Sequence, residues 1–270
     1  VGNLASGTDY PEAMDYIQTY ARDNSVKEYL ELIHQAKGAV SIPVIASINC
    51  HSSSEWISFS SDIQEAGADA LELNIYYPGL DERKDPREYE KVYLDIVKKV
   101  SEKTTLPIII KLGSHFTNLT WFVDQLRLRG ASGVVLFNRF YAPDIDPEEL
   151  TMGSAEVLST PAEIRNSLRW VGIISSKVDK IDISASTGVH SGMGVIKQLL
   201  AGAEAVQVCS VLYRNGVDYV GNILAEVRKW MEKKQFRSVE EFRGRMNYSN
   251  LKDPAAYERA QFIKYFSKMH

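Results

Sequence analysis

The sequence predicts an α/β fold, a TIM (β/α)8-type barrel in which six of the eight strands can be identified. One phrase occurs three times: a helix ends at a glycine, one small residue follows, and a strand rich in Val, Leu and Ile comes next. It covers 65–75, 128–138 and 200–210, and a further apolar strand precedes each occurrence, at 42–49, 106–113 and 180–186. Alternating strands and helices indicate a parallel sheet covered by helices, and the repeated βαβα unit favours the barrel over an open sheet.

The first forty residues supply helices instead of strands. One helix is predicted at 11–22, with Asp9 before it and Pro11 in its first turn, and a second at 25–37. Because no strand is recognisable in 1–40, we expect the chain to start part-way through a barrel, with one βαβα unit missing from the front. The outer strands would then lack partners, which predicts a homodimer.

Later helices follow the same signals. They are predicted at 86–103, 119–129, about 191–201 and 218–233, after Ser238, and over 254–269. The segment 141–158 is expected to be a loop or small hairpin. Thr160 and Glu163 form a capping box, which starts the next helix.

Length and composition fit a single domain over 1–270. Within it we expect a helical lead-in at 1–40, a loop over the barrel mouth at 139–160 and a C-terminal helical extension at 249–270. A net charge of -4 argues against nucleic acid as a partner. No apolar run approaches the roughly 20 residues of a membrane span. Cys50 and Cys209 are too few for a disulfide framework, which favours a reducing cytoplasm.

In a parallel barrel the reacting groups lie at the carboxyl ends of the strands. The polar residues at these ends are mainly amides, hydroxyls and one lysine: Ser47, Asn49, Asn74, Tyr76, Tyr77, Lys111, Asn138, Arg139, Ser186, Thr187, Cys209 and Ser210. The absence of a carboxylate from this set argues against glycoside hydrolysis. His51 and His190 have no partner at metal-ligand spacing, so no metal site is predicted.

The ends of the last two strands have the character of a phosphate site. The turns Ser186-Thr187-Gly188 and Cys209-Ser210 consist of small residues, which leave backbone N–H groups uncovered next to a helix start. Barrel enzymes hold phosphates in this way, between the loops after strands 7 and 8. The alternative is an ordinary βαβ unit in which small residues only permit close packing.

Lys111 follows three isoleucines, where an ammonium group needs an anionic partner or a ligand. Three interpretations remain open: a Schiff-base lysine of an aldolase, a lysine that stabilises a reduced flavin, or a lysine that extends to solvent at the rim. Asn74 and Asn138 lie on the strands either side of it. Their side chains can donate and accept hydrogen bonds together, as a planar cyclic amide requires.

Six segments together resemble the dihydroorotate dehydrogenases, chiefly the soluble class 1 branch, over about residues 40–248. They are LELNIYYPG (71–79), IIIKLG (108–113), VVLFNR (134–139), SASTGVHSG (184–192), AEAVQVCSVLYRNG (203–216) and SVEEFRGRM (238–246). The resemblance implies an FMN-dependent dehydrogenase of pyrimidine biosynthesis, a barrel that oxidises dihydroorotate to orotate by passing a hydride from the substrate to the flavin.

The resemblance also implies roles for residues. Ser47 and Asn74 match positions that contact flavin or substrate, Lys111 matches a lysine at the flavin's pyrimidine edge, and Asn138 matches a substrate-facing asparagine. The backbone that binds the phosphate corresponds to Ala185, Ser186, Thr187 and Gly188, with Cys209 and Ser210.

Three positions depart from the family pattern on the substrate side. Tyr77 stands where the family has its catalytic cysteine or serine, Gly79 where a substrate-binding asparagine is usual, and Arg139 where a small hydroxyl residue is usual. An unperturbed phenol, with a pKa of about 10, is a weak base near neutrality. Tyr77 and Arg139 are therefore the candidate catalytic and substrate-binding residues for dihydroorotate or another cyclic amide.

Two other functions stay open at this point. The chain is either the oxidoreductase, a non-catalytic or truncated barrel paralogue, or, through Lys111, a Schiff-base aldolase. The charged loop 80–87 follows Tyr77 directly and is bounded by Gly79 and Pro86, which predicts a mobile lid or a plain solvent loop.

Overall fold

Six parallel strands form the central sheet of the protein. A computed structural model describes residues 11–50, 53–140, 143–154 and 156–258. The strands are β1 (Ile45–Ile48), β2 (Ala70–Asn74), β3 (Ile108–Leu112), β4 (Ala131–Leu136), β7 (Asp182–Ala185) and β8 (Ala205–Val206). They lie in the order β1-β2-β3-β4-β7-β8, and every neighbouring pair is parallel. All six predicted strands are therefore present, in the predicted arrangement.

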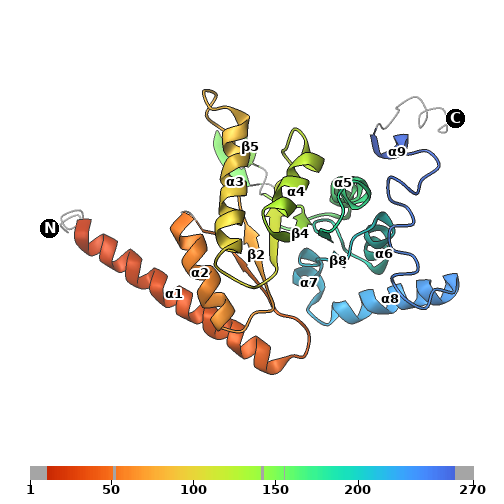
Figure 1. Cartoon of the computed structure of the whole chain (residues 1–270), viewed down its shortest axis with the longest axis horizontal. Coiled ribbons are helices and arrows are strands. Elements are labelled where there is room, and N and C mark those ends of the chain that lie inside the picture. The colour runs from red at the N-terminus through yellow and green to blue at the C-terminus, as the bar shows by residue number, and fades with distance from the viewer. Residues whose placement is uncertain (1–10, 51–52, 141–142, 155, 259–270) are drawn as a thin grey trace.

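Helices cover the outside of this sheet. Figure 1 shows α1, α2 and α3 at one side of the molecule and α5, α6 and α8 at the other, with the strands between them. Their bounds are α1 (Pro11–Ala39), α2 (Ser53–Glu65), α3 (Pro86–Ser101), α4 (Leu119–Leu128), α5 (Ile164–Lys177), α6 (Gly192–Ala201), α7 (Ser210–Asn215), α8 (Tyr219–Lys234) and α9 (Ala255–Glu258). The core lies between the sheet and the helices that cover it, where strand residues such as Leu71, Ile110 and Val134 are fully buried.

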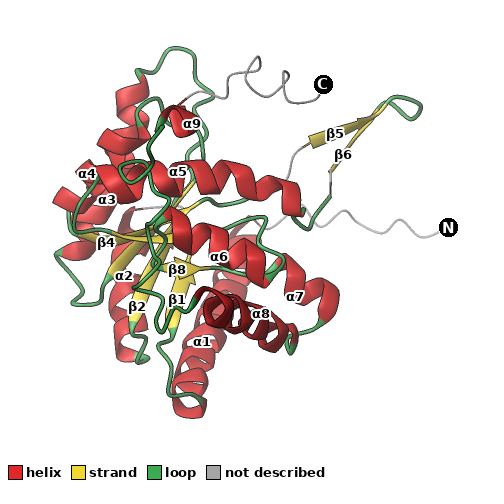
Figure 2. Ribbon diagram, turned by 90° about the vertical axis from the view of Figure 1, so that its right-hand side faces the viewer, coloured by secondary structure: helices red, strands yellow, loops and turns green. Residues whose placement is uncertain are grey.

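The sheet is strongly curled. Strands β2 and β8 are four places apart in the strand order, yet Gln207, directly after β8, donates a hydrogen bond to Glu72 on β2. A side-chain contact over this span requires the sheet to roll towards a barrel, with its inward side chains facing one another. Figure 2 shows the strands grouped at the centre of the helices. Among the described residues, β1 and β8 form the two unjoined edges of the sheet.

Helix ends follow the predicted chemistry. Asp85 and Ser191 accept hydrogen bonds from the first turns of α3 and α6. The three glycines of the repeated phrase have left-handed backbone conformations, with φ of 93° at Gly67, 102° at Gly130 and 115° at Gly202. Glycine adopts this conformation without the steric cost of a Cβ, which explains why the helix-to-strand turns recur with the same residue.

The predicted break near residue 24 is wrong, because α1 is one continuous helix over Pro11–Ala39. No glycine or proline interrupts it between Glu12 and Lys37, and the cap preference of Asn and Ser is too weak to end an otherwise regular helix. Its Tyr29 hydroxyl donates to the Ser47 carbonyl and accepts from the Ser47 N–H, both at 2.9 Å. Helix α1 thus satisfies backbone groups of the β1 edge that a neighbouring strand would otherwise pair.

The connection between β4 and β7 contains a hairpin and the predicted capping box. Strands β5 (Pro143–Asp146) and β6 (Thr151–Ser154) pair in antiparallel fashion, and Figure 2 shows them extending away from the helices. The short helix η1 (Pro161–Glu163) follows, and Glu163 Oε1 accepts a hydrogen bond from the Thr160 N–H at 2.6 Å. The hairpin and the cap are both as expected for this segment.

The predicted helix after Ser238 is absent, and turns occupy this segment. The Gly244 N–H donates to the carbonyl of Leu199 and the Met246 N–H to that of Leu200, so these backbone groups bind α6 instead of forming a helix. Of the helix predicted at 254–269, only α9 lies within the described residues. The same limit applies to 1–10 of the lead-in. No helix in the described ranges combines the length and apolar character needed to cross a membrane.

Candidate active site

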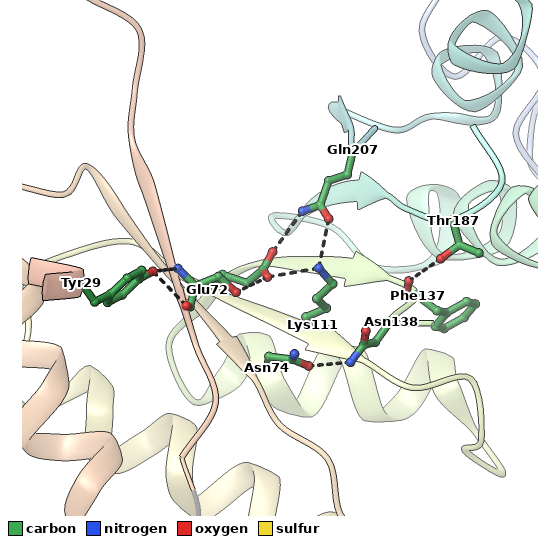
Figure 3. Close-up of polar contacts among 9 residues, drawn as sticks. Tyr29, Glu72, Asn74, Lys111, Phe137, Asn138, Thr187 and Gln207 are labelled. Atoms are coloured by element: carbon green, nitrogen blue, oxygen red, sulfur yellow. Dashed lines mark hydrogen bonds and ion pairs between the residues drawn. The ribbon is translucent and has the colours of Figure 1, made fainter. Parts of the chain in front are cut away.

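Three side chains from different strands meet inside the curled sheet. Lys111 Nζ on β3 lies 3.4 Å from Glu72 Oε1 on β2 and 3.3 Å from Gln207 Oε1 after β8. Gln207 Nε2 donates to Glu72 Oε2 at 3.0 Å, so the amide links the carboxylate to the ammonium group. Figure 3 shows these contacts converging between the two ends of the sheet. The interior therefore contains an ion pair that a neutral amide bridges.

The predicted set of strand-end residues contains no carboxylate, but Glu72, from inside β2, joins this interior cluster. Its residue is 4% exposed, and Ser47 Oγ on β1 donates to Glu72 Oε1 at 2.6 Å. Residues two apart on a strand point to the same side, so Glu72 shares a side of β2 with Asn74. A strand-end rule misses Glu72 because it lies two residues before the last residue of the strand.

Asn74 and Asn138 lie side by side, as expected from their strand ends. Asn138 Nδ2 donates to Asn74 Oδ1 at 2.7 Å, a contact drawn in Figure 3. The other side-chain atoms of this pair, Asn74 Nδ2 and Asn138 Oδ1, have no hydrogen-bond partner within the described part of the chain. This pair therefore offers one donor and one acceptor to a ligand, which match the N–H and C=O of a cyclic amide.

The turn after β7 offers free backbone donors. Thr187 and Gly188 have φ of 76° and 78°, and Thr187 Oγ1 is fixed by donation to the Phe137 carbonyl at 3.1 Å. A Cβ on Gly188 would lie 2.2 Å from the backbone nitrogen of Ile164, so only glycine fits against the start of α5. In the described structure the N–H groups of Thr187 and Gly188 donate to no other residue. Successive free N–H groups of this kind bind anions.

Ser210, the first residue of α7, binds Ser159, which lies in the connection before η1. The Ser159 N–H and Ser159 Oγ both donate to Ser210 Oγ at 3.0 Å, and Ser159 Oγ also lies 3.0 Å from His190 Nε2. Burial, together with the positive charge of Arg214, lowers the pKa of His190, so its ring is neutral at pH 7. These contacts hold the two turns of the predicted phosphate site against each other.

Arg139 is held at the rim by two contacts. Its Nε donates to Glu163 Oε2 at 2.8 Å and its Nη1 to the Val157 carbonyl at 2.9 Å. Burial raises the pKa of Glu163, but Arg139 and the Thr160 N–H outweigh this effect and leave the pKa below its usual value. The guanidinium of Arg139 therefore has a carboxylate partner within the protein before any substrate binds.

One cavity of about 750 Å³ joins most of the candidate residues. Its volume lies within the range typical of cofactor and ligand sites. Eight predicted site residues line it: Lys111, Asn138, Arg139, Ser186, Thr187, Gly188, Cys209 and Ser210. Asn74 lies next to it through its bond to Asn138. Ser47 lines a different cavity and is linked to Lys111 through Glu72, and Ala185 is fully buried.

Tyr77 lines a second cavity, of about 520 Å³, which is rich in aromatic side chains. Its ring meets that of Tyr93 edge to face, with centroids 6.0 Å apart, and its N–H donates to the Tyr93 hydroxyl at 3.2 Å. A smaller cavity of about 300 Å³ shares Asn138 with the first cavity and His115 with the second. The three cavities therefore adjoin one another across the barrel mouth.

The donor set fits a flavin mononucleotide. Free backbone N–H groups at the Ser186–Gly188 turn suit the phosphate, and Lys111 and the asparagine amides suit the polar edge of a heteroaromatic ring. Glu72 and Gln207 are the two interior residues that sequence reasoning missed. Glu72 could have been found from its spacing to Asn74, whereas Gln207 lies one residue beyond the short strand β8.

Comparisons with known proteins point to one family. The sequence model of the dihydroorotate dehydrogenase family matches residues 14–231, a match that starts earlier and ends earlier than the six segments indicate. A putative dihydroorotate dehydrogenase A (fumarate) of Aeropyrum pernix is 30% identical over 87% of this chain and 78% of its own length. The catalytic subunit of dihydroorotate dehydrogenase B (NAD(+)) of Pyrococcus furiosus is 31% identical over 77% of this chain and 70% of its own length.

Proposed function

This chain belongs to the dihydroorotate dehydrogenase family, and we propose that it is an FMN-dependent oxidoreductase that acts on a CH–CH bond of dihydroorotate or a similar cyclic amide. The observation that carries the proposal is the single cavity in which Lys111, Asn138 and the Ser186–Gly188 turn converge. A cation, a pair of amides and free N–H groups in one cavity are the donors that a flavin mononucleotide needs. Family membership favours this activity over the aldolase and the non-catalytic paralogue.

Each group has a separate role in this proposal. FMN, when bound, supplies the acceptor for the two electrons that leave the substrate. The Thr187 and Gly188 N–H groups, with Cys209 and Ser210, bind its phosphate, and Lys111 stabilises negative charge on its ring. Asn74 and Asn138 orient the substrate through their free donor and acceptor. Arg139, which Glu163 already pairs, contacts the substrate at the rim of the cavity.

Tyr77 is the proposed proton acceptor on the substrate side. It occupies the family's position for this group, but it lines the aromatic cavity beside the main one. A substrate that reaches Tyr77 must therefore extend from the asparagine pair towards Tyr93. This arrangement suits a cyclic amide that is larger than dihydroorotate or carries an apolar substituent.

The test is to reconstitute the purified chain with FMN and then add dihydroorotate without oxygen. The proposal expects a bound flavin spectrum that bleaches on addition of the substrate. A bound flavin that stays oxidised would retain the cofactor and reject dihydroorotate, which directs the search to other cyclic amides. Failure to bind FMN would reject cofactor and substrate together. A borohydride-trapped adduct on Lys111 with a carbonyl compound would instead support the aldolase.

Two further parts of the proposal concern the oligomeric state and the cellular location of the protein. The β8 edge of the sheet, which pairs with no further strand among the described residues, supports a homodimer, which sedimentation analysis tests against a monomer of 30.4 kDa. The free thiol of Cys209 supports a reducing cytoplasmic location, because an oxidising compartment favours disulfides. Localisation of a tagged full-length protein tests this second point.

A further inference from the structure

We propose that Glu72 is a positioning residue, which through Lys111 and Gln207 sets the charge that the main cavity presents to FMN. The inference rests on the proposed function, because it concerns the cofactor of that site. It adds a residue that neither the strand-end pattern nor the phosphate turn identifies. Glu72 does not line the main cavity, whereas Lys111 and Gln207 both do.

The carboxylate is the centre of the interior polar cluster. It accepts from Ser47 Oγ at 2.6 Å and from Gln207 Nε2 at 3.0 Å, and it lies 3.4 Å from Lys111 Nζ. These partners come from β1, from the end of β8 and from β3, so Glu72 links both edges of the curled sheet to its middle. Figure 3 shows the carboxylate between Lys111 and the β1 side of the sheet.

The ion pair is asymmetric in its exposure. The side chain of Glu72 is 5% exposed and that of Lys111 is 21% exposed. The ammonium group therefore faces the cavity and the carboxylate lies behind it. Gln207 reinforces this order, because its Nε2 binds the carboxylate and its Oε1 is thereby directed to Lys111. A ligand in the cavity meets a positive charge that the carboxylate behind it partly balances.

This balance has a direct effect on the cofactor. Two electrons and one proton enter FMN on reduction, so the reduced form carries one more negative charge than the oxidised form. Lys111 stabilises that charge, and Glu72 weakens this stabilisation by pairing with the ammonium group at 3.4 Å, in a partly buried environment where charges interact more strongly than in water. Glu72 is thus expected to keep the reduction potential of the bound FMN lower than Lys111 alone would set it.

The measurement is the reduction potential of FMN bound to the Glu72→Gln variant. Glutamine keeps the shape and removes the charge, and its Oε1 can still accept from Ser47 Oγ, although its Nε2 cannot accept from Gln207. We expect the ratio of the dissociation constants for oxidised and reduced FMN to rise on the order of tenfold, which moves the potential by about +30 mV for a two-electron couple. The control is Asp124→Asn, which removes a carboxylate from the Arg127 ion pair on α4 and should leave the potential unchanged.

A double-mutant cycle tests whether Glu72 acts through Lys111. Lys111→Gln should lower the potential, and adding Glu72→Gln to it should change the potential by less than a third of the single-variant shift. Glu72→Asp, which keeps the charge, provides a milder variant if Glu72→Gln does not fold. It should raise the potential by less than half as much, because the carboxylate is withdrawn by one methylene.

The possible outcomes separate this inference from the proposed function. If Lys111→Gln lowers the potential and neither Glu72 variant changes it, the inference is overturned and the FMN site stands. If Lys111→Gln changes neither the potential nor the affinity for FMN, both are overturned. Equal shifts from Glu72→Gln with and without Lys111 would also overturn the inference, because Glu72 would then act on FMN directly.

Discussion

Glu163 connects two parts of the rim at the scale of a single residue, since one oxygen binds Arg139 and the other binds the Thr160 N–H. Its pKa in the folded protein lies below the usual value of 4.5. A lowered pKa stabilises the fold above the unfolded-state pKa, and this contribution disappears as pH falls through the folded-state pKa. Glu163→Gln should therefore lower the stability at pH 7 by at most about 1 kcal/mol, because the pair is partly exposed.

Thermal denaturation at several pH values checks this prediction. The difference in Tm between the native chain and Glu163→Gln should be at most about 2–4 °C at pH 7 and should decrease as the pH falls through the lowered pKa of Glu163. Glu148→Gln, in the exposed turn of the β5–β6 hairpin, is the matched control and should have no effect at either pH. A Tm difference that is the same at pH 7 and pH 3 would contradict the assignment.

Tyr77→Phe tests the proposed proton acceptor. Removal of the hydroxyl should slow reduction of bound FMN by the substrate roughly 10²- to 10⁴-fold, the usual contribution of a general base. The affinity for FMN should not change, because Tyr77 lies outside the main cavity. Stopped-flow measurement of the FMN absorbance gives the rate. A variant that is reduced at the native rate would show that another group accepts the proton.

Sequence patterns predict the site residues better than their partners. Lys111, Asn138 and the Ser186–Gly188 turn follow from reading strand ends, because a parallel barrel brings those ends to one rim. Glu72 and Gln207 do not follow, since their contact depends on how far the sheet curls. Tyr77 occupies the expected loop, but the direction of its side chain is decided by packing against Tyr93.

At the scale of an element, α1 protects the edge of the sheet through Tyr29. Its hydroxyl binds both the N–H and the carbonyl of Ser47 on β1, and burial raises the pKa of the phenol. Tyr29→Phe leaves these two polar groups without that partner, so a loss of about 1–3 kcal/mol in the free energy of unfolding is expected. Urea denaturation measures the loss. Tyr219→Phe on α8 is the control, because its hydroxyl binds no described residue.

The glycines that end the helices give a matched pair of substitutions. A Cβ on Gly67 would meet only Lys37 Cγ at 3.9 Å, whereas on Gly202 it would lie 2.4 Å from Ser175 Oγ. Gly67→Ala should therefore cost only the strain of a left-handed backbone, about 1–2 kcal/mol, as measured by urea denaturation. Gly202→Ala should cost about 1–3 kcal/mol more, because a well-packed contact must shift. Equal losses would mean that Ser175 moves aside freely.

The same elements show where local sequence signals are sufficient. The repeated phrase predicts three of the six strands, β2, β4 and β8, because the glycine that closes the helix before each of them is required by a backbone conformation that other residues adopt with strain. The cap-like residues at Ser25 and Ser238 give wrong predictions. In the first case the helix continues through the cap, and in the second the backbone finds partners on α6. A cap signal is therefore decisive only where no competing partner exists.

At the scale of the whole molecule, the site joins strands from both ends of the sheet. The cavity takes Lys111 from β3 and Ser210 from the start of α7, and the Glu72–Gln207 bond crosses from β2 to the end of β8. A ligand in this cavity contacts elements that are far apart in the chain. Its binding energy should therefore stabilise the curled sheet as a unit, and not one turn alone.

Thermal denaturation with FMN and with riboflavin separates phosphate binding at the turn after β7 from binding of the flavin ring. At a hundredfold excess over its dissociation constant, FMN should stabilise the fold by about 2.7 kcal/mol, which raises Tm by about 5–10 °C. Riboflavin lacks the phosphate and cannot use the free N–H groups of Thr187 and Gly188, so the same concentration should give a much smaller increase. Gly188→Ala should remove the difference between the two ligands, because its Cβ would displace the turn from Ile164. If riboflavin raises Tm as much as FMN does, the turn after β7 binds no phosphate, and the small residues there serve packing alone.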